Sequence, residues 1–541
     1  MGVHVPALPL DLLDHATAQV QRRRGRPQRL PFDATPANQP DIDATRRTAW
    51  LFASTRLLSP ATATMGRSAF IEAVRQTGIV LDAPRLSRWE SGSAQAPARL
   101  LGAYEDLAEL PRGTLRATST MVQRVARVAT PSISPPSMAE EQVDDLFAHV
   151  ESGESTGDTW LDLAAELTRY DRIYLPVEAW TRLSTRLVNE LTRATGISFL
   201  RRYEAAALLM RHPTSQRHLA RALGVMVMHE DVQNAAPALA LLSEVGDESA
   251  GELVVRLTQA QNRPLRRATV GVAAVMAARD LLPPGSQLAL EGIAAAELRK
   301  GGMGRRIAAI ELATQLPEQH YDRVVPAMPD GPLRAQVASA RVRRELAPAD
   351  LARSVAETVA SHAESTHQRA AHDPDQMLRR LVRESMFHVQ RERRQLAATM
   401  ISVSPYARAT SQAVLRLTLE RNELVSARAW AMLGRLSHVL DRNELRACID
   451  EHRPALRARA FNTLGLVPGP LEDDVADGLL SSAADAPQHS LRHAATFALG
   501  MAGHDHVRHL SEHGVDDVRR ASRWWVELGS AVHDRDLPAP A

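Results

Sequence analysis

The feature that most constrains the fold is a short helical pattern that recurs at intervals of roughly 30 to 40 residues, a period typical of stacked helix pairs. Three copies combine small and large apolar residues and end in glycine: residues 427–434, 456–465 and 491–500. Their last residues, Gly434, Gly465 and Gly500, are 31 and 35 residues apart. The sequence therefore predicts an array in which each unit contributes two helices to a continuous core.

The remainder of the chain from residue 138 to residue 532 supports the same fold. It is a succession of amphipathic segments, each roughly 12–18 residues long, separated by short breaks at Gly, Pro or Asp. Two earlier copies that begin with arginine pairs place Arg266 and Arg305 39 residues apart. Aromatic residues make up only 4% of the chain, whereas Ala, Leu, Arg and Glu are abundant, which favours helices over sheets. We expect an all-α fold.

These segments resemble HEAT-like repeats, in which an arginine followed by small and apolar residues opens the inner helix of each pair. Small residues such as Ala460 and Ala495 let neighbouring helices approach, and large ones such as Phe461, Leu464 and Leu499 fill the core between repeats. The resemblance implies a HEAT-like α-solenoid over residues 138–532. The alternative is an irregular helical domain without true repeats.

A chain of 541 residues is long enough for more than one domain, and proline-rich stretches divide it. Residues 1–43 are expected to hold a short helix (about 8–21), an arginine cluster and a linker with three prolines between residues 31 and 40. Residues 44–127 have a compact helical pattern of their own. A second linker is expected at 128–137 and a flexible tail at 533–541.

The most specific motif lies between residues 82 and 107. Asp82 is suited to cap a helix that has Pro84 in its first turn, and Gly92 is suited to end it. In that helix Leu86 and Trp89 would face inward. Pro97 would start the next helix, and residues 67–76 form an upstream helix with an apolar stripe of Phe70, Ile71 and Val74.

The run Leu86-Ser87-Arg88-Trp89-Glu90-Ser91-Gly92 resembles the recognition helix of the Cro/repressor-type (XRE) helix-turn-helix family, and the resemblance covers about residues 45–115. The connection 77–82 is longer than the usual turn of that family. The resemblance implies that double-stranded DNA is read in the major groove. The reading positions it implies are Ala83, Pro84, Arg85, Ser87 and Arg88.

Among these positions, Arg85 and Arg88 are the expected carriers of specificity. An arginine can grip guanine through two hydrogen bonds, whereas Ala83 and Pro84 offer only apolar contact, for instance to a thymine methyl group. The alternative is that both arginines only solvate an exposed helix face, with Trp89 and Glu90 used in packing and local pairing.

A second basic element lies upstream. Its arginines are Arg22, Arg23, Arg24 and Arg26. The core Arg24-Gly25-Arg26-Pro27 resembles the AT-hook, which implies an arm in the narrow minor groove of A·T-rich DNA. Generic attraction to phosphate and a merely soluble linker are the alternatives.

The charge distribution separates the two ends of the chain. The total is nearly even, with 65 basic and 63 acidic residues, and all basic residues except Lys300 are arginine. Residues 1–130 hold 17 arginines and 11 acidic residues, a net charge of +6, and the rest of the chain has a net charge of −4. The expected DNA-binding end is therefore the basic one, where counterion release would favour binding.

Catalysis and cofactors have no support in the sequence. Cys448 is the only cysteine, which excludes intrachain disulfides and cysteine-based zinc sites. No Ser or Thr follows Lys300 directly, so a phosphate-binding P-loop is impossible, and no HExxH or GxSxG motif occurs. A histidine series, His506, His509 and His513, has spacing that could ligate a metal, but a solvated cap is favoured. We expect no enzyme, no metal site and no cofactor.

Together these features predict a sequence-specific DNA-binding transcriptional regulator in the cytoplasm, associated with the nucleoid. The chain has no secretory signal pattern at its start and no stretch of about 18 uncharged apolar residues that could span a membrane. The helical repeats would mediate dimerisation, so that two recognition helices meet a palindromic site, and would bind a protein or peptide ligand or another signal. One alternative function is an interaction scaffold with a helix-turn-helix that binds no DNA. A second alternative is a small-ligand receptor, which would need a pocket inside the solenoid.

Overall fold

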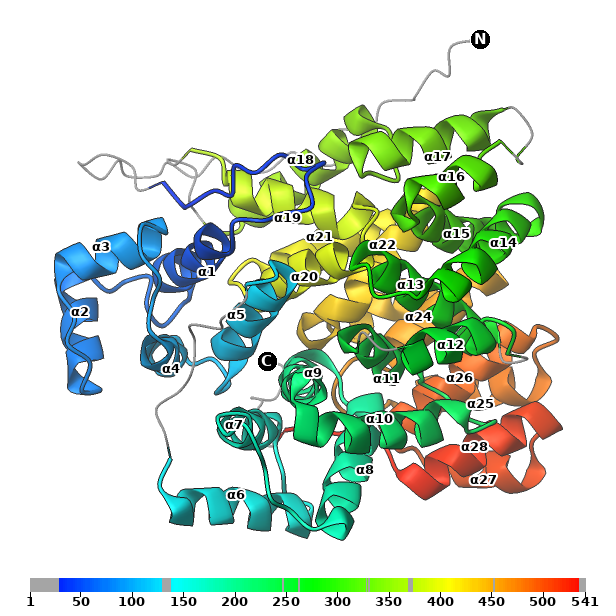
Figure 1. Ribbon diagram of the computed structural model, residues 1–541, viewed down its shortest axis with the longest axis horizontal. Coiled ribbons are helices and arrows are strands. Elements are labelled where there is room, and N and C mark those ends of the chain that lie inside the picture. The colour runs from blue at the N-terminus through cyan, green and yellow to red at the C-terminus, as the bar shows by residue number, and fades with distance from the viewer. Residues whose placement is uncertain are drawn as a thin grey trace.

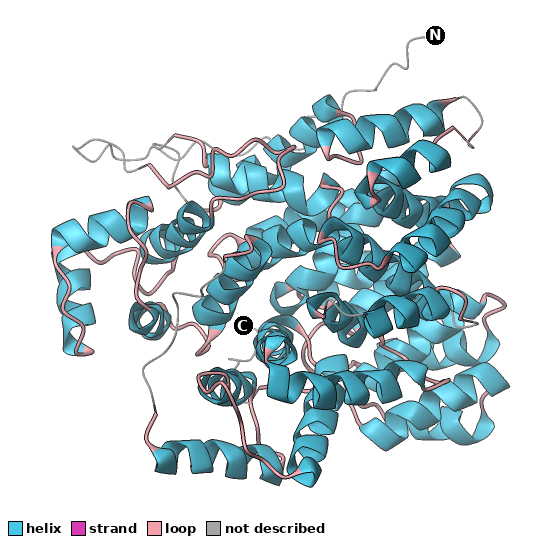
Figure 2. Cartoon of the chain, viewed as in Figure 1, coloured by secondary structure: helices cyan, strands magenta, loops and turns pink. Residues whose placement is uncertain are grey.

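The computed structural model is all-α, as the sequence predicts. It describes residues 29–128, 138–245, 248–260, 263–326, 328, 331–367, 373–450 and 453–534. Within these ranges there are 28 α-helices joined mostly by short loops, and no strand (Figures 1 and 2). None of the described helices is both long enough and apolar enough to cross a membrane.

The first five helices form the unit that contains the predicted helix-turn-helix. They are α1 (Ala44–Leu58), α2 (Arg67–Gln76), α3 (Ala83–Ser91), α4 (Ala98–Leu107) and α5 (Thr114–Val125). The other helices form the repeat array. They are α6 (Glu140–Ser152), α7 (Gly157–Leu167), α8 (Val177–Arg193), α9 (Gly196–Arg211), α10 (Pro213–Met228), α11 (Ala236–Leu241), α12 (Glu248–Leu257), α13 (Arg263–Ala278), α14 (Pro284–Lys300), α15 (Met303–Gln315), α16 (Glu318–Val324), α17 (Pro332–Arg343), α18 (Ala349–Ser365), α19 (Gln376–Phe387), α20 (Arg391–Ser402), α21 (Ala407–Leu417), α22 (Glu423–Leu436), α23 (Arg446–Ile449), α24 (Pro454–Leu464), α25 (Asp473–Asp485), α26 (His489–Ala502), α27 (His506–His513) and α28 (Asp516–Leu528).

The three recurring segments lie on α22, α24 and α26, which pack against one another in that order. Two of their glycines, Gly465 and Gly500, lie where the next unit approaches closely. A Cβ atom added at Gly465 would lie 3.0 Å from the Phe497 ring of α26, and one added at Gly500 would overlap the Trp525 ring of α28. At these two positions an aromatic side chain of the next unit fills the space beside the glycine, whereas Gly434 has only Leu466 within 4 Å, at 3.6 Å.

The array also makes contacts between units far apart in the chain. Glu311 of α15 is bonded to Arg428 of α22, and Arg279, which follows α13, donates from Nε to Glu392 of α20 at 2.9 Å. Helix α20 packs against α5 and α13 as well as α22. These contacts join units of the array that are not neighbours in the chain.

The C-terminal residues return to the beginning of the array. Val532 N–H donates to the carbonyl of Arg193, and Asp534 bonds to Arg201 and Arg202 of α9, both at 2.7 Å. The Asp534 side chain is fully buried. The predicted start of the flexible tail, residue 533, is therefore too early in the sequence, because Asp534 is bonded to two buried arginines. Residues 535–541 lie outside the described ranges.

The five-helix unit shares its core with the array, contrary to a boundary that separates two domains. A small core holds Phe52 of α1, Leu115 of α5 and the apolar residues of α2, α3 and α4. Trp50, on another side of α1, and Met121 of α5 belong to the core of the array. Helices α1 and α5 therefore contribute residues to both cores.

The proline-rich segment that was expected to be a linker is held against the array. Asp33, whose side chain is fully buried, accepts from Arg47 Nε of α1 at 2.7 Å. Arg380 of α19 bonds to the backbone carbonyls of Asp33 and Thr35. The expected helix at 8–21, and all of the second linker except Val128, lie outside the described residues.

Candidate nucleic-acid interface

Helix α3 begins and ends where the sequence predicts. The Asp82 carboxylate accepts from Arg85 N–H at 2.7 Å, which caps the helix, and Pro84 lies in its first turn. Gly92 ends the helix with φ +70°, a left-handed conformation that favours glycine. A Cβ atom there would lie 2.9 Å from Arg46 Cδ and 3.3 Å from Ala49 Cβ of α1, so both conformation and close approach require the glycine.

All five predicted reading residues are exposed: Ala83, Pro84, Arg85, Ser87 and Arg88. Leu86 is fully buried on the opposite side, and Trp89 is half-buried against the small core. Helices α2 and α3 project at the left edge of the molecule in Figure 1, away from the array. This placement leaves one side of α3 open to a partner.

The two arginines of this face differ in their surroundings. Arg85 lies beside Asp82, with 3.7 Å between Nε and Oδ2, and also donates from Nη1 to the Val80 carbonyl at 3.2 Å. The guanidinium of Arg88 has neither an ion pair nor a hydrogen bond to any residue that the structure describes. Arg88 is therefore the freer of the two to bind an external group.

Helix α3 is anchored from behind by a buried ion pair that sequence reasoning did not identify. Arg56 of α1 donates to both carboxylate oxygens of Glu90, at 2.6 and 2.7 Å, and Tyr104 Oη of α4 donates to Glu90 at 2.8 Å. Burial opposes the charge of Arg56, but the hydrogen bonds and charge of Glu90 outweigh burial and raise the Arg56 pKa. Burial, followed by the Glu90 charge, raises the pKa of Tyr104 well above its ordinary value.

Two further exposed arginines lie on α2 and α4, the helices before and after α3, at positions unfavourable for helix stability. Arg67 is the first residue of α2, and Arg99 is the second residue of α4. The N-terminus of a helix carries a partial positive charge, which repels a cation there. Their signal in the sequence is a basic residue one or two positions after the residue that precedes the helix, Gly66 for Arg67 and Pro97 for Arg99.

The structure changes the meaning of the regional charge count. Arg47, Arg56 and Arg124 are buried and paired with carboxylates, so they add no positive charge to the surface. The predicted arm residues Arg22, Arg23, Arg24 and Arg26 lie outside the described ranges. A net charge of +6 over residues 1–130 therefore does not measure the exposed charge beside α3.

Histidines meet at a place that the spacing did not indicate. Among the described residues, one group could hold an ion: His489, His493 and Asp517, whose ligand atoms lie within 4.8 Å of one another. Asp517 already accepts from Arg492 at 2.7 Å, and that guanidinium opposes a cation. The predicted series is dispersed, since His506 bonds to Asp477 at 2.9 Å while His509 lies against His513. We assign no metal to either group.

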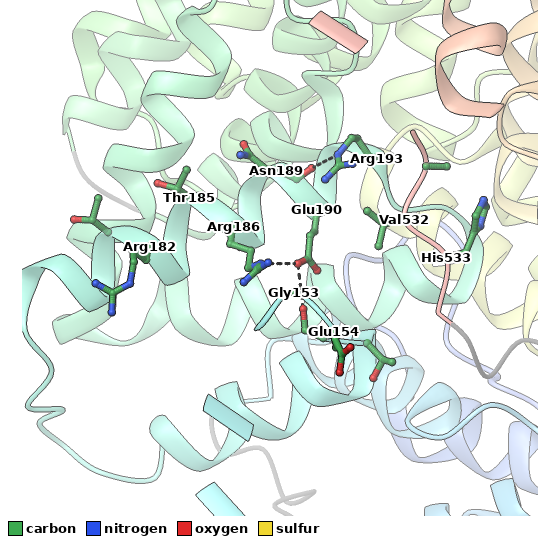
Figure 3. A pocket seen from close by; sticks show the side chains of 14 residues that line it. Gly153, Glu154, Arg182, Thr185, Arg186, Asn189, Glu190, Arg193, Val532 and His533 are labelled. Atoms are coloured by element: carbon green, nitrogen blue, oxygen red, sulfur yellow. Dashed lines mark hydrogen bonds and ion pairs between the residues drawn. The ribbon is translucent and has the colours of Figure 1, made fainter. Parts of the chain in front are cut away.

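A pocket of about 760 Å³ lies far from α3, between α8, the loop 153–156 and residues 531–533 (Figure 3). Its arginines have partners. Arg186 lies 3.4 Å from Glu190, Arg193 donates to the carbonyls of Asn189 and Ser530, and Arg182 pairs with Glu151 at 2.8 Å. This balance favours a structural role for these residues.

Comparison with known proteins gives no family. No family model and no curated protein matches the chain. A solved structure concerning tubulin recruitment and assembly by microtubule polymerases with Tumor Overexpressed Gene (TOG) domain arrays is 12% identical, with a TM-score of 0.22, and the match covers 79% of this chain and 100% of that one. An engineered protein is 13% identical, with a TM-score of 0.20, over 71% of this chain and 98% of that one. Likeness at this level gives no information on function.

Proposed function

We propose that the protein is a sequence-specific DNA-binding transcriptional regulator with α3 as its recognition helix. The observation that supports this proposal best is the exposure of all five reading positions on one projecting helix. The buried pair of Arg56 and Glu90 fixes that helix to α1 and leaves its outer side free. A rigidly held helix with an open polar face suits the major groove.

In this proposal one group of residues contacts base edges and another group binds phosphates. Arg88 and Arg85 donate to guanine, Ser87 donates to or accepts from a base edge, and Ala83 and Pro84 contact a thymine methyl group. Arg85 exchanges its partner Asp82 for the base. Arg67 and Arg99 bind phosphates on either side of the groove, which accounts for their exposed positions at helix starts.

The rest of the molecule completes the regulator. Two copies bind a palindromic site, with the repeat array supplying the contact between them. The protein acts in the cytoplasm on nucleoid DNA, and the proposal includes no catalytic step.

Selection of duplexes from a random pool by the purified full chain tests this function. We expect an enriched motif, and Arg88→Ala should weaken binding to it by roughly 1–3 kcal/mol and relax the preference at one base pair. The matched control is Arg519→Ala, which removes an exposed arginine of α28 and should leave binding unchanged. Absence of an enriched motif would contradict the proposal.

The alternative is an interaction scaffold in which the five-helix unit is an integral part of the array. The shared packing of α1 and α5 in both cores favours this alternative. If Arg88→Ala and Arg67→Ala both leave retention on duplex DNA unchanged at several salt concentrations, the scaffold is the better description.

A further inference from the structure

A cavity of about 230 Å³ lies where the five-helix unit meets the array. Met121 of α5 lines it together with residues of α9, α11, α20 and α22. Two of its lining residues are arginines, Arg391 at the start of α20 and Arg435 near the end of α22. It is thus a site built from segments far apart in the chain.

Neither arginine has a carboxylate partner among the described residues. Between them lies Gln395, whose amide oxygen, oriented to satisfy both, accepts from Arg391 Nε and from Arg435 Nη2, each at 3.2 Å. A neutral amide oxygen leaves both positive charges uncompensated. Because one oxygen reaches both guanidinium groups, a single anionic group could also bridge them.

Two acidic residues whose charges act on residues of the cavity wall already have partners. Glu311 is bonded to Arg394 at 2.8 Å and to Arg428. Glu392 is bonded to Arg279 and lies 3.6 Å from Arg124. If Glu311 or Glu392 moved to pair with Arg391 or Arg435, an arginine that it binds now would lose its carboxylate partner.

Apolar and aromatic surface forms the rest of the cavity wall. The Arg435 guanidinium lies over the Phe199 ring, with 4.9 Å to the ring centre, and Tyr203 also lines the cavity. Cation–π contact orients the guanidinium but leaves its N–H donors available. The cavity therefore offers charged donors beside a flat apolar surface.

The electrostatic surroundings of the two arginines favour an anion between them. Burial, and then the charge of Arg391, lower the pKa of Arg435 to about 10. Burial also lowers the pKa of Arg391 in spite of the charge of Glu311. Arg391 and Arg435 are both half-buried, and only a neutral amide lies between them, so they form a positively charged pair without a carboxylate at the cavity wall.

We propose that this cavity binds a small organic anion, with its negatively charged oxygens between Arg391 and Arg435 and its apolar body against Phe199. The site requires no DNA and does not depend on the function proposed for α3. Because Met121 belongs to α5, a bound anion would contact the helix that joins the five-helix unit to the array.

Titration calorimetry on the full chain tests the site with three probes that share one ring system and differ in charge: 1-naphthoate, 1-naphthyl phosphate and the neutral 1-naphthalenemethanol. We expect one anion to bind per chain, roughly tenfold or more tighter than the alcohol, because charge-assisted hydrogen bonds are the stronger ones. The tighter of the two anions identifies the preferred group. This comparison uses the unaltered protein and does not depend on how any variant folds.

Variants then locate the bound probe. Arg391→Gln and Arg435→Gln should each weaken binding of the preferred anion about 10- to 100-fold. Arg182→Gln, in the other pocket, is the matched control and should not change binding. Without a probe, Arg435→Gln should leave the Tm unchanged or raise it, since it removes an unpaired charge. The proposal fails if neither anion binds, if the alcohol binds as tightly, or if both cavity variants bind like the unaltered chain.

Discussion

Buried arginine side chains join segments of this molecule that are far apart in the sequence. Arginine supplies all but one of the basic residues, and its planar group with five donors suits buried pairs better than the compact ammonium of lysine. Arg47 joins Asp33 to Glu384, and Arg124 joins Glu204 to Glu244. These bonds link segments up to 337 residues apart in the chain. Such partners cannot be read from local sequence.

Buried groups that lose their charge in the fold give a prediction about acid stability. Burial, and then the charge of Arg393, lower the pKa of His388 from 6.5 to about 3. His388 is therefore neutral in the folded chain at pH 5 but protonated in the unfolded chain. Because the unfolded chain binds the extra proton, the free energy of unfolding falls as pH drops below 6.5, by about 1.4 kcal/mol per pH unit from this residue.

Urea denaturation between pH 7 and pH 5 checks this contribution. His388→Gln should remove that part of the pH dependence and give the shallower slope. His513→Gln, at an exposed position on α27, should keep the slope of the unaltered chain. Equal slopes for His388→Gln and the unaltered chain would show that His388 titrates normally.

At the scale of single elements, α3 depends on an anchor from its neighbours. Glu90→Gln leaves Arg56 buried without a carboxylate, and we expect a loss of about 3–5 kcal/mol in the free energy of unfolding. Glu72→Gln in α2 removes an exposed pair with Arg75 and should cost less than about 1 kcal/mol. Urea denaturation of the two variants distinguishes the roles, and similar losses would mean that the Glu90 charge has no special place in the fold.

The elements also show which parts of the fold were predictable. The two ends of α3 were, because Asp82, Pro84 and Gly92 act within a turn of the positions they determine. The exposed arginines of α3 followed from the same periodicity. The anchor at Glu90 did not, because Arg56 is 34 residues away and an acidic residue on a helix is usually solvated. Arg391 and Arg435 come together only through the packing of α20 on α22.

The whole molecule departs most from the expected architecture at its ends. In a simple solenoid each unit contacts only its neighbours, so its two ends are independent. Here Asp534 joins Arg201 and Arg202 of α9, and Arg520 of α28 pairs with Asp231 at 3.1 Å. The repeat period in the sequence carries no information on such closure, since it describes only neighbouring units.

Because the two ends of the array are in contact, we expect a substitution at the C-terminal end to lower the local stability at the beginning of the array. Asp534→Asn leaves two fully buried arginines short of a carboxylate, and we expect a loss of about 3–5 kcal/mol in the free energy of unfolding. Asp516→Asn removes only an exposed pair with Arg519 and should cost less than about 1 kcal/mol.

Hydrogen exchange of the backbone amides locates the effect. If the ends are coupled, Asp534→Asn speeds exchange in α7 and α9 as well as in α28, because the same carboxylate holds both ends. Exchange that rises only after residue 516 would mean that the array behaves as an open chain of neighbours.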